Sequence, residues 1–287
     1  MYAQFEYLRP AGLPELLELL AEEREDTVLY AGGTDLLVDL RARKRVAGRV
    51  IDIKGAAPLR EISERDGCLA IGSACTLSEA VSSPLVRRRA PALAQAASKV
   101  GSVQIRNKAT LAGNIQTASP AGDGLNAALA LDGTAVLLSR QGERRVPLTD
   151  YICGPRRTLL AAGELVASIE IPKRAWTKQG FFKVGRRNAL AISVVNGTVA
   201  LELEGETVTD ARICVGAAAP VPLRIVAAEE LLRGRPLSEE GIELAAQAVR
   251  EGVCPISDLR ASAEYRAYMA GVMVKRQLRA FWEGGEP

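Results

Sequence analysis

The chain has 287 residues, 48% of them hydrophobic but only 4% aromatic, and a formal net charge of +3. This length suffices for two or three domains with sizeable cores, and so weak a charge gives no indication of nucleic-acid binding. The sequence contains no histidine, and its five cysteines form no Cys-x-x-Cys pair, which argues against histidine-dependent hydrolysis and against a metal cage. With no membrane-span pattern and no secretion signal at the N-terminus, we expect a cytoplasmic protein.

The first part of the chain predicts a small βαβ unit. Residues 13–24 place leucines at helical spacing between carboxylates, which predicts an amphipathic helix. Residues 27–31 and 49–53 are typical of strands, and residues 36–43 between them predict a helix. The turn that leads from the first strand into this helix contains Gly32-Gly33-Thr34-Asp35.

The middle of the chain predicts a mixture of helices and short strands. Thr76-Leu-Ser-Glu79 is a capping box that opens a helix, and residues 85–99 predict another helix. Residues 101–123, which include several glycines, are predicted to form a loop. The other predicted elements are strands at 68–72 and 164–171, a helix at 125–131 and a hairpin at 134–139 and 143–147. The pattern indicates an α+β fold.

A polar, interrupted segment near residues 172–180 predicts a domain boundary. Beyond it, three strands of an antiparallel sheet are expected at 181–184, 192–203 and 208–215. Helical patterns follow at 222–233, 239–251 and 260–282.

Two segments combine glycines with small hydroxyl and amide side chains, Ala31-Gly-Gly-Thr-Asp-Leu-Leu37 and Thr110-Leu-Ala-Gly-Asn-Ile-Gln-Thr-Ala-Ser-Pro-Ala-Gly-Asp123. Glycine lets a ligand approach the backbone, and N–H groups at the start of a helix favour an anion such as pyrophosphate. Neither segment has the spacing of a Rossmann fingerprint or a P-loop, so two loops would have to share the phosphates. The alternative interpretation of the first segment is a plain turn in which Thr34 or Asp35 caps a helix.

The chain resembles the FAD-binding subunit of the molybdenum hydroxylases over residues 5–280. Besides the two glycine segments, the resemblance is carried by Gln104-Ile-Arg-Asn-Lys-Ala109, by Thr158-Leu-Leu with Glu164-Leu-Val and Ile169-Glu-Ile-Pro172, and by Phe181-Phe-Lys-Val-Gly-Arg-Arg187. This family includes xanthine dehydrogenase, carbon monoxide dehydrogenase, and nicotinate and aromatic acyl-CoA relatives.

The resemblance implies an FAD-binding domain made of two α/β subdomains of the vanillyl-alcohol-oxidase (PCMH) type, within the α+β class. The subdomains would span residues 1–56 and 57–174. A C-terminal flavoprotein domain, residues 178–285, would hold a three-stranded antiparallel sheet and a helical bundle.

The resemblance also implies a set of FAD-binding residues, with no catalytic side chain and no metal ligand in this chain. Gly32, Gly33 and Thr34 would lie at the pyrophosphate, Asp123 at the flavin, and Lys183 near the ring. A cation there would stabilise the reduced flavin and raise its potential. The full set is Leu29, Tyr30, Ala31, Gly32, Gly33, Thr34, Asp35, Leu36, Val100, Thr110, Ala112, Gly113, Asn114, Thr117, Ser119, Asp123, Val166 and Lys183.

Two departures from the family pattern stand out. Asn188-Ala-Leu-Ala-Ile192 occupies the place of an Asp-Ile-Ala run, which changes the charge of that loop, and Val100 stands where some relatives have an aromatic side chain. The lack of a cysteine cluster disfavours the acyl-CoA-reducing branch, whose members can carry an inserted iron–sulfur loop in this subunit.

The function implied is that of the FAD-containing electron-transfer subunit of a heteromeric, xanthine dehydrogenase-like oxidoreductase. A large subunit would hold the molybdenum cofactor and a small subunit two [2Fe-2S] clusters, and this chain would pass their electrons to NAD+ or another acceptor. The alternatives are the FAD subunit of a carbon monoxide, nicotinate or aldehyde dehydrogenase relative, a stand-alone flavin oxidase, and a scaffold subunit that has lost its flavin.

Overall fold

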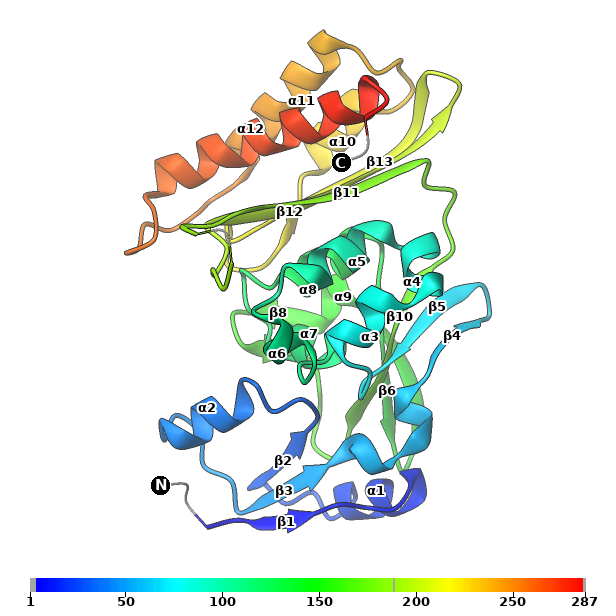
Figure 1. Ribbon diagram of the computed structural model, residues 1–287, viewed down its shortest axis with the longest axis vertical. Helices are drawn as coiled ribbons and strands as arrows, with labels where there is room; N and C mark the ends of the chain where they lie inside the picture. The colour runs from blue at the N-terminus through cyan, green and yellow to red at the C-terminus, as the bar shows by residue number, and fades with distance from the viewer. Residues whose placement is uncertain (1–3, 188, 286–287) are drawn as a thin grey trace.

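The computed structural model describes residues 4–187 and 189–285 as three parts stacked along the long axis of the molecule (Figure 1). A small βαβ unit lies at one end, a mixed α+β part in the middle, and a sheet covered by helices at the other end. The parts follow one another in chain order, so the middle part forms a junction with each of its neighbours. Among the described residues, no helix is long and apolar enough to cross a bilayer.

The first part contains the predicted βαβ unit. Strands β2 (Thr27–Tyr30) and β3 (Arg49–Asp52) are parallel and are connected through helix α2 (Leu36–Arg41). A short strand that the pattern did not indicate, β1 (Glu6–Leu8), pairs with the other edge of β3. Helix α1 (Leu13–Leu20) ends four residues before the predicted end. Leu20 is therefore the last buried residue of α1. It belongs to an apolar cluster that includes Ile51 and reaches Leu165 of the middle part.

The middle part is built on a five-stranded sheet with antiparallel neighbours in the order β4-β5-β10-β6-β7. The predicted strand at 68–72 and the predicted hairpin are present, and β4 pairs with β5 at one edge. The strands are β4 (Ile62–Arg65), β5 (Cys68–Gly72), β6 (Thr134–Ser139), β7 (Gly142–Pro147) and β10 (Leu165–Pro172). Shorter elements are η1 (Ile53–Gly55), η2 (Ala57–Arg60), α9 (Leu148–Tyr151), β8 (Ile152–Gly154) and β9 (Arg157–Thr158).

Among the helices beside this sheet, one begins as the sequence predicts and another prediction was wrong. Helix α3 (Leu77–Ser82) begins with the predicted capping box, because Thr76 and Glu79 satisfy each other's backbone N–H groups. The prediction of a single helix over 85–99 was wrong, since α4 (Pro84–Arg89) and α5 (Pro91–Ser98) are separate. Pro91 disfavours the helical conformation at Ala90, whose φ is −140°.

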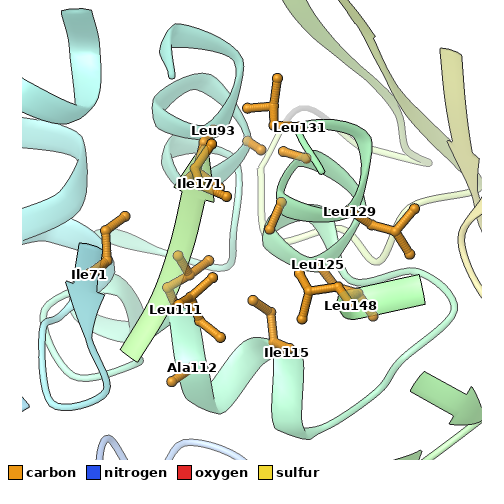
Figure 2. Packing of buried hydrophobic residues seen from close by; sticks show 14 of the residues in the cluster. Ile71, Leu93, Leu111, Ala112, Ile115, Leu125, Leu129, Leu131, Leu148 and Ile171 are labelled. Atoms are coloured by element: carbon orange, nitrogen blue, oxygen red, sulfur yellow. The ribbon is translucent and has the colours of Figure 1, made fainter. Parts of the chain in front are cut away.

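The prediction of a loop at 101–123 was also wrong, because this segment contains two short helices, α6 (Val103–Arg106) and α7 (Leu111–Gln116). Ser102 and Thr110 accept hydrogen bonds as N-caps of these helices, and of the two only Thr110 was proposed as a binding residue. Helix α8 (Asp123–Ala130) follows directly. Figure 2 shows Leu111, Ala112 and Ile115 of α7 among the buried side chains of the middle part, with Leu125 of α8 and Leu148. Part of the segment therefore builds the core.

The third part contains the three predicted antiparallel strands, and a fourth, short strand is added to them. The sheet has the order β11-β12-β13-β14, formed by β11 (Lys178–Val184), β12 (Val195–Glu204), β13 (Thr207–Gly216) and β14 (Leu223–Arg224). Helices α10 (Val226–Leu232), α11 (Glu239–Gly252) and α12 (Ala263–Trp282) lie over one face (Figure 1). The sheet also contacts α5 and α8 of the middle part, so polar residues on β12 can reach the start of α8.

Candidate functional site

A cleft of about 1030 Å³ is lined by residues of all three parts, such as Gly32, Asn114 and Lys183. Its volume lies at the upper end of the range of about 300–1,000 Å³ found for ligand pockets. The cleft is therefore large enough for a ligand of dinucleotide size.

The first wall of the cleft is the turn between β2 and α2. A Cβ atom at Gly32 would lie 2.2 Å from the backbone oxygen of Lys108, so the turn touches the backbone that leads into α7. Gly33 has a φ of +71°, and a Cβ there would lie 2.2 Å from Cε2 of the Tyr30 ring. Both positions require glycine for reasons internal to the protein. The first glycine segment therefore lies against the two residues, Lys108 and Ala109, that directly precede the second one.

The second wall is the start of α7. Thr110 accepts a hydrogen bond from the Gly113 N–H at 3.0 Å, and a Cβ at Gly113 would meet only the Thr110 hydroxyl, also at 3.0 Å. Gly113 lines the cleft, so its missing side chain leaves room there. Asn114 also lines the cleft, but its side-chain oxygen accepts the Leu125 N–H at 3.1 Å and so connects α7 to α8.

Two side-chain contacts connect the first and middle parts. The Thr117 hydroxyl donates to Asp35 at 2.9 Å, and Arg156 forms an ion pair with Asp39 at 3.0 Å. Both aspartates belong to the segment that begins α2, and their partners lie on the other side of the cleft. These contacts join the first part of the molecule to the middle part, and the first of them gives the Asp35 carboxylate a partner within the protein.

At the far end of the cleft, Asp123 is 4% exposed and has three partners. Lys183 Nζ lies 2.5 Å from its Oδ2, while Ser193 Oγ and Asn196 Nδ2 donate to Oδ1 at 2.7 Å and 2.6 Å. Lys183 also donates to the backbone oxygen of Lys99 at 2.9 Å. The resemblance implied a lysine near the flavin ring, and in the structure Lys183 lines the cleft while its charge is balanced by Asp123 in an ion pair that joins α8 to the third part.

Two polar residues of β12 that the sequence did not indicate as site residues connect this strand to α8: Asn196 through Asp123, and Thr198 through Asn126. Asn196 and Thr198 are completely buried, and the Thr198 hydroxyl donates to Asn126 of α8 at 2.8 Å. Positions 196 and 198 lie on one face of a strand whose other residues are mostly apolar. Because polar side chains are seldom buried without hydrogen bonds, this pattern was the signal available in the sequence.

All but three of the proposed binding residues line the one cleft. The exceptions are Tyr30, which packs beneath Gly33, and Ala112 and Val166, which are buried in the core of the middle part. Asn188, on which the charge argument for its loop depended, lies outside the described residues. The cleft is also lined by residues that the sequence did not indicate, including Lys44, Arg45, Ile105, Arg156, Leu190 and Ile192.

Comparisons with known proteins cover almost the whole chain. Residues 3–174 match the family described as FAD binding domain in molybdopterin dehydrogenase, and residues 180–281 match the CO dehydrogenase flavoprotein C-terminal domain. The chain is 35% identical over 273 residues to the nicotinate dehydrogenase FAD-subunit of Eubacterium barkeri, covering 91% of this chain and 90% of that protein. It is 32% identical over 279 residues to the carbon monoxide dehydrogenase medium chain of Hydrogenophaga pseudoflava, with 97% of each chain covered.

The fold agrees with solved structures of such proteins. A chain of the carbon monoxide dehydrogenase from Hydrogenophaga pseudoflava, in a form that lacks the Mo-pyranopterin moiety, superposes with a TM-score of 0.93, 33% identity and 99% coverage of both chains. A chain of quinoline 2-oxidoreductase from Pseudomonas putida 86 also gives 0.93, with 28% identity and complete coverage of both chains. The protein therefore belongs to the FAD-binding subunits of the molybdenum hydroxylase family.

Proposed function

We propose that the cleft holds FAD in an extended conformation and that the chain acts as an electron-transfer subunit. The observation that carries this proposal is that Gly32 lies against the backbone of Lys108 and Ala109, directly before the second glycine segment, beside a cleft of about 1030 Å³ that both segments line. Neither segment alone has a complete nucleotide-binding motif, so a pyrophosphate would have to be bound by both segments together.

The residues present fit such a ligand. The turn at Gly32 and Gly33 would face the pyrophosphate, and the open side of Gly113 would admit it close to the backbone. The pair formed by Asp123 and Lys183 would lie at the flavin end, where it offers a fixed acceptor and a fixed donor without net charge. When bound, the flavin supplies the redox chemistry, and the protein binds, orients and tunes it. No side-chain acid or base is required, which agrees with the absence of histidine.

The finer part of the proposal concerns the electron path. We infer that electrons come from a [2Fe-2S] cluster of a small partner subunit, that a large subunit with molybdenum cofactor oxidises a xanthine-type or related substrate, and that NAD+ or another acceptor takes the electrons. Support comes from relatives named as the FAD-subunit of nicotinate dehydrogenase and the medium chain of carbon monoxide dehydrogenase, both of which are parts of larger enzymes.

Reconstitution of the purified full chain tests FAD binding. After incubation with FAD and removal of free ligand, the protein should be yellow and carry the absorption bands of oxidised flavin. A chain that stays colourless while correctly folded would contradict the proposal and would favour a scaffold subunit that has lost its flavin. Turnover of an organic substrate by the chain without partners would instead support the stand-alone oxidase.

The Gly113→Leu variant tests whether the ligand occupies the second wall. The new side chain would meet only the Thr110 hydroxyl at its Cβ, so the free energy of unfolding should change little. The rest of the leucine would fill space that the cofactor needs, and overpacking of about 1–3 kcal/mol corresponds to a dissociation constant for FAD raised by about 10- to 100-fold. Titration with FAD followed by flavin fluorescence measures this change, and unaltered affinity would mean that the cofactor does not contact α7.

A further inference from the structure

Three side chains form a cluster behind the turn at Gly32 and Gly33. Asp52 ends β3 and is 2% exposed, Lys54 lies in the following turn η1, and Tyr7 belongs to the neighbouring strand β1. The Tyr7 hydroxyl donates to Asp52 Oδ2 at 2.6 Å, and Lys54 Nζ lies 2.9 Å from Asp52 Oδ1. The backbone N–H of Lys54 donates to the same Oδ1 at 2.9 Å. The ammonium group is thus directed by a buried carboxylate that is itself held by two elements.

Lys54 contacts the turn at two points. Its ammonium group donates to the backbone oxygen of Ala31 at 2.9 Å and lies 3.7 Å from the centroid of the Tyr30 ring. That ring in turn occupies the space that a side chain at Gly33 would need. Lys54 therefore holds the residue before Gly32 directly, and it holds Gly33 through the ring.

The directions of the pKa shifts agree with a lysine held in a fixed arrangement rather than with a solvated surface lysine. Burial lowers the pKa of Lys54, and the bond to Asp52 offsets this only in part. For Asp52, burial acts to raise the pKa, but the hydrogen bonds from Tyr7 and Lys54 outweigh it and keep the pKa below its usual value. The hydrogen bond to Asp52 is also the main reason why the pKa of Tyr7 is raised to about 12. At neutral pH the cluster contains one cation, one anion and a neutral phenol.

We propose that Lys54 is a positioning residue for FAD binding, acting through the Ala31 carbonyl and the Tyr30 ring on the turn that would receive the pyrophosphate. The inference rests on the proposed function. Lys54 itself is not among the residues that line the cleft, so its effect must pass through the turn. It should therefore affect ligands that carry a pyrophosphate and leave the flavin end of the site unchanged.

The test compares the dissociation constants of FAD and riboflavin for the full chain and for Lys54→Met. We expect the substitution to weaken FAD binding about ten-fold, the size of one charge-assisted hydrogen bond, and to leave the weaker binding of riboflavin unchanged. Lys54→Arg, which keeps a cation and several donors, should restore FAD affinity to within about three-fold of the original value.

The matched control is Arg49→Met. Arg49 lies on β3, the strand that precedes Lys54, is 7% exposed and forms ion pairs with Glu6 and Glu22, but it does not hydrogen-bond to the turn. If the effect of Lys54 were only a general loosening of the first part, Arg49→Met would weaken FAD binding to the same degree. Equal losses in the two variants would overturn the inference, as would an equal loss of riboflavin binding in Lys54→Met.

Three further outcomes are distinguishable. If Lys54→Met does not fold, Lys54→Gln, which keeps a donor for Ala31 but loses the charge over Tyr30, should weaken FAD binding about three-fold, and unchanged affinity would overturn the inference. If the unaltered chain binds FAD and Lys54→Met binds it equally well, only this inference fails. If the unaltered, folded chain binds no FAD, the proposed function fails and the inference fails with it.

Discussion

Asp123→Ala should lower the free energy of unfolding by about 3–5 kcal/mol, the cost of removing one partner of a buried ion pair. The substitution leaves the Lys183 ammonium, whose side chain is 13% exposed, without its carboxylate, and it removes the acceptor of Ser193 and Asn196. Chemical denaturation of the chain without cofactor measures the change. The matched control is Glu61→Ala, which removes half of an exposed pair with Arg65 and should cost about 0.5 kcal/mol or less.

The double variant Asp123→Ala/Lys183→Met separates the pair from its surroundings. Because it leaves no unpaired charge, it should be more stable than the sum of the two single effects predicts. Simple addition of the two effects would mean that the two groups do not interact. In the FAD-bound protein, the single variants should shift the flavin potential in opposite directions. Lys183→Met leaves an anion beside the reduced flavin and lowers the potential, whereas Asp123→Ala leaves a cation and raises it.

Gly32→Ala should lower the free energy of unfolding by about 3 kcal/mol, the upper end of the cost of overpacking, and should abolish tight FAD binding. The added methyl would lie 2.2 Å from the Lys108 backbone oxygen and 2.7 Å from the Ala109 Cα atom, and neither can rotate away as a side chain could. The first part of the molecule would have to move away from α7, which would separate the two walls of the cleft. Thermal unfolding and FAD titration measure the two effects.

Gly12→Ala is the control for this substitution in the same part of the molecule. A Cβ there would meet only the Cδ atom of Pro14, at the ordinary distance of 3.6 Å, so stability and FAD affinity should both be retained. If Gly32→Ala behaved like Gly12→Ala, Gly32 would not lie against the backbone that leads into α7, and the basis of the proposed site would be lost.

Elements with a strong local pattern could be predicted from the sequence. The βαβ unit, the capping box at Thr76 and Glu79, the hairpin of β6 and β7 and the strands of the third part are all present. The break at Pro91 was also a local signal, but the helical pattern on both sides concealed it. Helices α6 and α7 were missed because six residues or fewer give too little periodicity to distinguish a helix from a loop.

The role of individual residues in the candidate site could be predicted only in part. Thr110 lines the cleft as expected and its hydroxyl also caps α7, while Tyr30, Ala112 and Val166 lie behind the cleft rather than in its lining. Position in a motif indicates which segment lies near a ligand. It does not indicate which side of that segment faces the ligand, because this depends on what packs against the other side.

The sequence by itself determined the order of the strongly patterned elements, the family and the two segments that carry the glycines, since each of these depends on neighbouring residues or on a long motif. Only the tertiary structure decided that Gly32 lies against Lys108, that Lys183 is neutralised by Asp123 and that Lys54 holds the first turn from behind. These contacts join residues 23 to 76 positions apart. Local propensity carries no information on such pairs, which form only when the separate cores bring their elements together.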